Sequence, residues 1–170
     1  MTAAVLTHLG PYLRFGLTPI PLRTRSKEPP VKWNNGCNPT PQEFHRWFSN
    51  LSVNISVHCG ENLAVMDCDY GEALHTITAS RDLPTSCPVV KTGRGDHVWL
   101  KPSRPIRSQG LDGVGIKYFG IYMVALPSIH PSGVPYLFAV PVVRPFSSGV
   151  YVCRPELPCR KYITSFEVIR

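Results

Sequence analysis

The fold of this chain is organised around one stretch, Leu63-Ala64-Val65-Met66-Asp67-Cys68-Asp69. Its first four residues form a continuous apolar run, which is typical of a central strand buried on both faces. Because side chains alternate along a strand, Asp67 and Asp69 share one face and Cys68 points to the other. Neighbouring carboxylates repel each other unless a cation separates them, and oxygen ligands favour Mg²⁺ or Mn²⁺ shared with substrate phosphates. The alternative is a solvated turn, where Asp is common.

A glycine-rich turn follows in Thr92-Gly93-Arg94-Gly95-Asp96-His97. The flanking segments 88–92 and 97–101 are predicted strands, so the turn closes a hairpin. Glycine lets the backbone approach a phosphate closely, which makes Arg94 a candidate anion ligand and His97 a candidate triphosphate contact. The alternative is an ordinary hairpin with a surface histidine. Neither the P-loop spacing nor the dinucleotide-binding spacing is present.

The remaining elements alternate between helices and short strands. The second predicted helix has a capping box, in which Thr40 and Glu43 bracket Pro41. The content of Gly (13) and Pro (18) agrees with many turns. The pattern indicates an α/β or α+β fold, with helices over 2–15, 40–48 and 71–80, strands over 17–22, 54–58 and 136–143, and a hairpin joining 114–118 to 121–126.

Length and composition indicate one globular domain over residues 1–170, because 43% hydrophobic residues exclude wholesale disorder. No apolar run approaches the roughly 18 residues of a membrane span, and no secretory signal is recognisable. We therefore expect a cytoplasmic protein with no membrane partner. The six cysteines contain no CxxC pair. Cys153 and Cys159 are a weak candidate for zinc, and free thiols are the simpler interpretation.

The net charge of +7 is unevenly distributed. Residues 1–58 carry 6 basic and 2 acidic side chains, residues 59–100 carry 3 and 6, and residues 101–170 carry 9 and 3. Basic flanks point to a polyanion partner such as nucleic acid, whereas the acidic centre, which contains Asp67 and Asp69, points to a bound cation. Chance clustering on a solvated surface is the alternative.

The order of the motifs is more informative than any one of them. They are Gly16-Leu17-Thr18-Pro19-Ile20-Pro21-Leu22, Lys27 with Pro29, Trp33, the capped helix ending at Trp47, Asn54-Ile55-Ser56-Val57, and the segments 63–69, 90–97, 114–117 and 127–133. Over about residues 5–140 this series resembles the N-terminal prim-pol domain of the archaeo-eukaryotic primase superfamily. The resemblance implies mixed or antiparallel central sheets and an RRM-like catalytic half flanked by helices. It also implies a helicase after the domain, as in plasmid and phage replication proteins.

The resemblance gives roles to individual residues. The family's metal-binding acid pair falls on Asp67 and Asp69, and its triphosphate-contacting histidine falls on His97. Arg94, in the turn before it, becomes a phosphate contact. The remaining matches are Lys27, whose role is not assigned, and a nucleotide-side loop with Pro127, Ser128 and His130.

One position departs from the family pattern. The third motif of the family reads like Val-Asp-Ile-Arg, whereas this chain has Val114-Gly115-Ile116-Lys117. Glycine supplies no ligand, so the metal site lacks one of three carboxylates, and such losses slow catalysis strongly. Asp112 can replace it only if a bulge turns its side chain to the same face. Lys117 remains a candidate contact for phosphate or template.

Two functions are therefore expected. The first is a DNA primase/polymerase that joins nucleoside triphosphates to a 3′-hydroxyl on a single-stranded DNA template with Mg²⁺ or Mn²⁺. Trp33, Tyr118 and Phe119 then either stack on bases or lie in the core. The second is a degenerate domain that binds nucleotide or DNA without synthesis. A metal-dependent nuclease is a more distant alternative, since no further acid cluster supports it.

Overall fold

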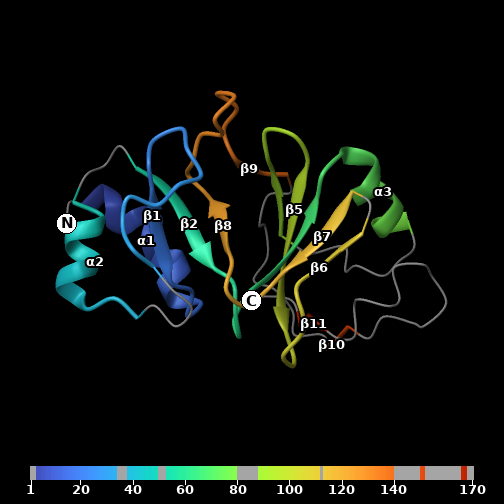
Figure 1. Ribbon diagram of the computed structural model, residues 1–170, viewed down its shortest axis with the longest axis horizontal. Helices are drawn as coiled ribbons and strands as arrows, with labels where there is room; N and C mark the ends of the chain where they lie inside the picture. Colours follow the sequence, from blue (N-terminus) through green and yellow to red (C-terminus); the bar gives the residue numbers. More distant parts are fainter. Residues whose placement is uncertain are drawn as a thin grey trace.

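The computed structural model describes residues 3–33, 38–49, 53–79, 88–111, 113–139, 150–151 and 166–167. These residues form an α+β fold with two antiparallel sheets, which confirms the predicted fold class. Figure 1 shows the smaller sheet with α1 (Ala3–Arg14) and α2 (Pro41–Trp47) on one side of the molecule, and the larger sheet with α3 (Gly71–Ala79) on the other. No helix in this described part of the chain is long and apolar enough to cross a membrane.

The smaller sheet has the strand order β1-β2-β8, with β1 at Pro19–Leu22, β2 at Asn54–His58 and β8 at Tyr122–Ala125. The helices on this side are α1 (Ala3–Arg14) and α2 (Pro41–Trp47). The predicted capping box of α2 is confirmed: the Glu43 backbone N–H donates to Thr40 Oγ1 at 3.2 Å, and the Thr40 backbone N–H donates to Glu43 Oε2 at 2.9 Å.

The larger sheet is centred on β3 (Ala64–Cys68), which pairs with β5 (Asp96–Pro102) on one side and β7 (Val114–Lys117) on the other. The predicted buried strand is therefore confirmed. The hairpin of β4 (Val89–Lys91) with β5 is confirmed as well, with Lys91 opposite Asp96. Further elements are β4 (Val89–Lys91), α3 (Gly71–Ala79), β6 (Gln109–Leu111), β9 (Leu137–Phe138), β10 (Val150–Tyr151) and β11 (Phe166–Glu167).

Both faces of β3 are covered, which explains its uninterrupted apolar run. Val65 belongs to the core shared with α1 and the smaller sheet, and it packs there with residues such as Trp99. Met66 and Cys68 belong to a second core, together with Ala73 of α3. Asp67 continues the Val65 face, so the strand aims its carboxylate toward the side occupied by the smaller sheet.

The predicted hairpin of 114–118 with 121–126 is wrong, because its two strands lie in different sheets. β7 pairs with β3 and β6, whereas β8 pairs with β2. The backbone N–H of Cys59 donates to the Ile121 carbonyl at 2.8 Å and ties the start of β8 to the smaller sheet. An alternating pattern specifies which face of a strand is buried and not which strand pairs with it. Of the predicted strand 136–143, β9 is observed, and residues 140–143 lie outside the described residues.

Candidate active site

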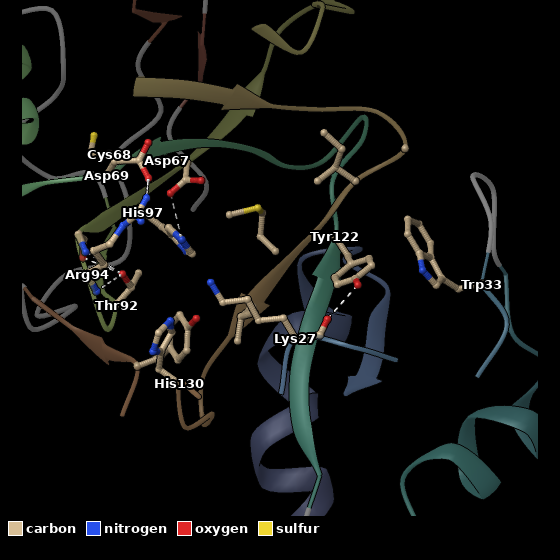
Figure 2. A pocket seen from close by; sticks show the side chains of 16 residues that line it. Lys27, Trp33, Asp67, Cys68, Asp69, Thr92, Arg94, His97, Tyr122 and His130 are labelled. Atoms are coloured by element: carbon tan, nitrogen blue, oxygen red, sulfur yellow. Dashed lines mark hydrogen bonds and ion pairs between the residues drawn. The ribbon is translucent and has the colours of Figure 1, made fainter. Parts of the chain in front are cut away.

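A cleft of about 590 Å³ lies where the two sheets meet. It is lined by β3, β5 and β8, by the turn before β5, and by the loops that carry Lys27 and His130. Figure 2 shows Asp67, His97, Arg94 and Asp69 at one end of this cleft and Trp33 at the other, with Lys27 reaching between them. The cleft therefore has a charged end and an aromatic end.

Asp67 lies at the centre of the charged end. Its strand neighbours in register are His97 on β5 and Gly115 on β7. Asp67 Oδ1 is 3.4 Å from His97 Nε2, and Asp67 Oδ2 is 3.7 Å from Lys117 Nζ. Partial burial raises the pKa of the Asp67 carboxyl, but the interactions with His97, Lys117 and Lys27 outweigh it and hold that pKa below its usual value. Asp67 is therefore a carboxylate that lies beside the imidazole of His97 and the ammonium group of Lys117.

Asp69 and Arg94 form the second charged contact of the cleft, with 2.5 Å between Asp69 Oδ1 and Arg94 Nη2. Both side chains are largely exposed, so the pair adds little stability and remains available to ligands. The turn that carries Arg94 is closed by Thr92, whose Oγ1 accepts from the backbone N–H groups of Arg94 at 3.2 Å and Gly95 at 3.0 Å. The turn thus fixes the backbone at Arg94, whose guanidinium bonds to Asp69 at the edge of the cleft.

The two glycines of this turn are needed for contacts within the protein. A Cβ on Gly95 would overlap the backbone carbonyl of Cys68, and a Cβ on Gly93 would overlap the imidazole of His130. Gly95 therefore lets the turn pack on the chain just before Asp69, and Gly93 lets it pack on the loop from 127. We predicted that these glycines let the backbone approach a phosphate. In the structure they let the turn approach the Cys68 carbonyl and the His130 ring.

Gly115 is covered by the side chain of Lys117. A Cβ on Gly115 would lie 3.1 Å from Lys117 Nζ and 3.2 Å from Lys117 Cε. The two residues lie on the same face of β7, since strand residues two apart share a face. The space beside Asp67 that a third carboxylate would enter is thus occupied by an ammonium group. Asp112, the predicted substitute, lies outside the described residues.

The opposite wall of the charged end is formed by His130, Tyr136 and Lys27. Burial, followed by the charges of Lys27 and Arg94, lowers the pKa of His130. The ring of Tyr136 lies 6.1 Å from that of His97 and 6.0 Å from that of His130, and burial together with Asp67 raises the Tyr136 pKa to about 12. The positive charges of Lys27 and Arg94 beside His130 make this wall suited to an anion.

Several lining residues have no counterpart among the predicted site residues, and the tyrosines Tyr122 and Tyr136 are among them. Each begins a predicted strand or lies next to its start, and the runs of apolar residues at 121–126 and 136–143 predicted those strands without marking either tyrosine as a site residue. Tyr122 packs edge-on against Trp33 with ring centroids 4.8 Å apart, and its hydroxyl donates to the Lys27 carbonyl at 2.9 Å. These contacts fix the aromatic end of the cleft.

Ser128 is not brought into the cleft. Its side chain is buried, and Oγ accepts from the backbone N–H of Ile55 at 2.9 Å and donates to the Ile55 carbonyl at 3.0 Å. It joins the loop to β2 and has no free hydroxyl for a nucleotide. Of the aromatic candidates, Tyr118 is buried in the second core and Phe119 is 59% exposed, while Trp33 lines the cleft.

The acid pair provides two carboxylates and no more. Among the described residues no three His, Cys, Asp or Glu side chains gather in a way that could hold a metal ion. Mg²⁺ commonly takes one or two protein carboxylates and completes its shell with phosphates and water. Asp67 and Asp69 meet this minimum, so the residues fit a metal shared with a bound triphosphate and do not form a site from protein ligands alone.

Comparison with protein families gives a match over most of the chain. A family model described as bifunctional DNA primase/polymerase, N-terminal, matches residues 11–149. The matched segment contains all the residues that line the cleft. A comparison with curated proteins finds no match.

Proposed function

The chain belongs to the family of bifunctional DNA primase/polymerase N-terminal domains, and its function is of the primase/polymerase type. On this premise we propose that the cleft transfers nucleotides from nucleoside triphosphates to a DNA 3′-hydroxyl paired with a single-stranded template. The observation that carries the proposal is the convergence of Asp67, His97, Arg94 and Lys27 on one cleft whose other end is aromatic. The pairing with a helicase in plasmid or phage replication belongs to the same proposal and rests on the family pattern.

The charged end suits a triphosphate. Arg94 and Lys27 offer cations to phosphate oxygens, and His97 lies between Asp67 and Tyr136, where it contacts a phosphate beside the carboxylate. Trp33 and Tyr122 form the wall at the other end, against which the nucleobase lies. A nucleotide would thus lie along the cleft, with its triphosphate at the charged end and its base at the aromatic end.

In the proposed reaction the 3′-oxygen bonds to the α-phosphorus, the bond to the β-phosphate breaks, and pyrophosphate leaves while the hydroxyl proton passes to water. A Mg²⁺ or Mn²⁺ ion held by Asp67 and Asp69 would supply positive charge to the phosphates. The protein's own contribution is to orient the triphosphate and to neutralise the charge that gathers on pyrophosphate, through Arg94 and Lys27.

A second function, nucleotide or DNA binding without synthesis, is favoured by a specific observation. Gly115 supplies no third carboxylate opposite Asp67, and Lys117 covers it. The ammonium group beside Asp67 repels a divalent ion and attracts phosphate. This arrangement supports retained triphosphate binding with weakened metal binding.

A primer-extension experiment separates the two functions. The protein is incubated with a primed single-stranded DNA template, labelled nucleotides and Mn²⁺, and Arg94→Ala serves as the cleft variant. Templated extension that is lost in the variant supports nucleotidyl transfer. Absence of extension with intact triphosphate binding contradicts it and supports the second function.

A further inference from the structure

A second hollow, distinct from the cleft, opens beside α2. This groove, of about 750 Å³, is lined by the loop after β1 and by α2, and Arg23, Lys32, Arg46, Glu43 and Trp47 are among its residues. It shares no lining residue with the cleft, yet the loop from 23 to 33 contributes to both, because Lys27 and Trp33 line the cleft. We call it the α2 groove.

The α2 groove carries an excess of positive charge. Arg23, Lys32 and Arg46 are exposed, and within the described part of the chain none of them forms an ion pair. Among the described residues that line the groove, Glu43 is the one acid, and its carboxylate accepts from the Thr40 backbone N–H and hydroxyl, both at 2.9 Å. Hydrogen bonds from Thr40, and then the charge of Arg46, lower the pKa of the Glu43 carboxyl, so Arg46 has an acidic neighbour, whereas Arg23 and Lys32 have no ion-pair partner among the described residues. Three cations still exceed the single acid among the described lining residues, which suits a polyanion.

The groove also has a fixed aromatic and apolar surface. Trp47 is half-buried and packs against the core that contains Phe48, so its ring is held while one side remains at the groove. Pro30, Val31 and Val53 complete the apolar part of the lining. Cations that follow a backbone, combined with an aromatic ring that stacks on a base, are the features by which proteins bind single-stranded nucleic acid. A duplex hides its base faces and cannot use Trp47.

We propose that the α2 groove binds the single-stranded template outside the cleft, with phosphates on Arg23, Lys32 and Arg46 and a base on Trp47. The proposal rests on the proposed function, because it assigns a path to the template of that reaction. It also accounts for the basic surplus of the first 58 residues, since Arg23, Lys32 and Arg46 are three of the six basic residues there. The cleft then holds the triphosphate while the adjoining groove holds the strand.

Fluorescence anisotropy with labelled single-stranded oligonucleotide tests the proposal. Each phosphate contact makes the slope of log affinity against log salt more negative by about 0.7. Arg23→Ala, Lys32→Ala and Arg46→Ala should therefore each weaken binding about fivefold near 0.1 M salt and make that slope shallower. Arg104→Ala and Arg107→Ala are matched controls, because both arginines are exposed and neither lines the groove or the cleft. Trp47→Phe should keep most of the affinity, and Trp47→Leu should lose more.

Several results would overturn the proposal: equal losses in the groove variants and the two controls, no loss in any variant, or duplex DNA that binds as tightly as the single strand. Nucleoside triphosphate affinity, measured separately, should be unchanged in the groove variants. Failure of the proposed function would give a different result. The protein would then synthesise no DNA, but single-stranded DNA would still bind and the groove variants would still weaken that binding, so the assignment of the α2 groove would hold. A thermal melt of Trp47→Leu excludes unfolding as the cause of its loss.

Discussion

Gly115 lies directly opposite Asp67 on the neighbouring strand of the larger sheet. His97 lies opposite Asp67 on the other side, so the three positions form one row across β7, β3 and β5. The row places a glycine at the position where a carboxylate could share a metal ion with Asp67. The ammonium group of Lys117, 3.7 Å from Asp67 Oδ2, occupies the space that this leaves.

Gly115→Asp should raise the affinity for Mn²⁺. The new carboxylate would point to the same face as Asp67, and the Lys117 side chain that it meets is flexible enough to move aside. Titration of the nucleotide-free protein with Mn²⁺, followed by electron paramagnetic resonance, measures the effect, and we expect an increase on the order of tenfold. Gly110→Asp is the matched control, because it adds the same charge one strand farther from Asp67. Equal gains in both variants would show a general charge effect instead.

Lys117→Met should change two affinities in opposite directions. Removal of the ammonium group beside Asp67 lowers the repulsion of a divalent ion, so Mn²⁺ should bind more tightly. It also removes a cation from the charged end, so a triphosphate should bind less tightly in the absence of metal. Calorimetric titration with each ligand measures both changes. If neither affinity moves, Lys117 has no electrostatic role in the cleft.

Gly95→Ala should destabilise the protein, because its Cβ would overlap the Cys68 carbonyl, which is backbone and cannot rotate away. We expect the free energy of unfolding to fall by about 1–3 kcal/mol, as for other overpacked sites. Gly71→Ala is the control, since nothing lies within 4 Å of its Cβ. Urea denaturation of both variants measures the difference. An unchanged midpoint for Gly95→Ala would mean that the turn does not pack on Cys68 as described.

Acid should destabilise the fold through His58. Burial lowers the pKa of its imidazole, and Nε2 is buried without a hydrogen-bond partner among the described residues. The unfolded chain takes up a proton near about pH 6.5 while the folded chain does not, so stability present above that pH is lost as the pH falls. His58→Phe, which keeps a ring beside Trp33 and Phe119, should lose less unfolding free energy between about pH 7.5 and about pH 5.5. His8→Phe, at an exposed position, should behave like the unchanged protein.

Local signals in the sequence predicted the elements that carry the site. The apolar run before Asp67 predicted β3, the turn around Arg94 predicted the hairpin of β4 and β5, and the capping box predicted the start of α2. Each of these depends on residues close together in the chain. They were therefore accessible without knowledge of the tertiary structure.

Long-range pairing was not accessible in the same way. The pattern of 114–126 indicated two strands and could not tell that they separate into two sheets. We predicted that Ser128 contacts a nucleotide, whereas its hydroxyl bonds to the backbone of Ile55, 73 residues away in the chain. The α2 groove likewise depends on a loop and a helix whose juxtaposition only the fold provides.

Triphosphate binding in the presence and absence of Mn²⁺ tests most directly the claim that Asp67 anchors a metal-assisted nucleotide site. Calorimetry compares the unchanged protein with Asp67→Asn and with Glu61→Gln, an exposed acid in the turn before β3. We predict that Mn²⁺ increases triphosphate affinity in the unchanged protein and in Glu61→Gln, and that the increase disappears in Asp67→Asn. An Mn²⁺-dependent gain of equal size in all three proteins would contradict the account.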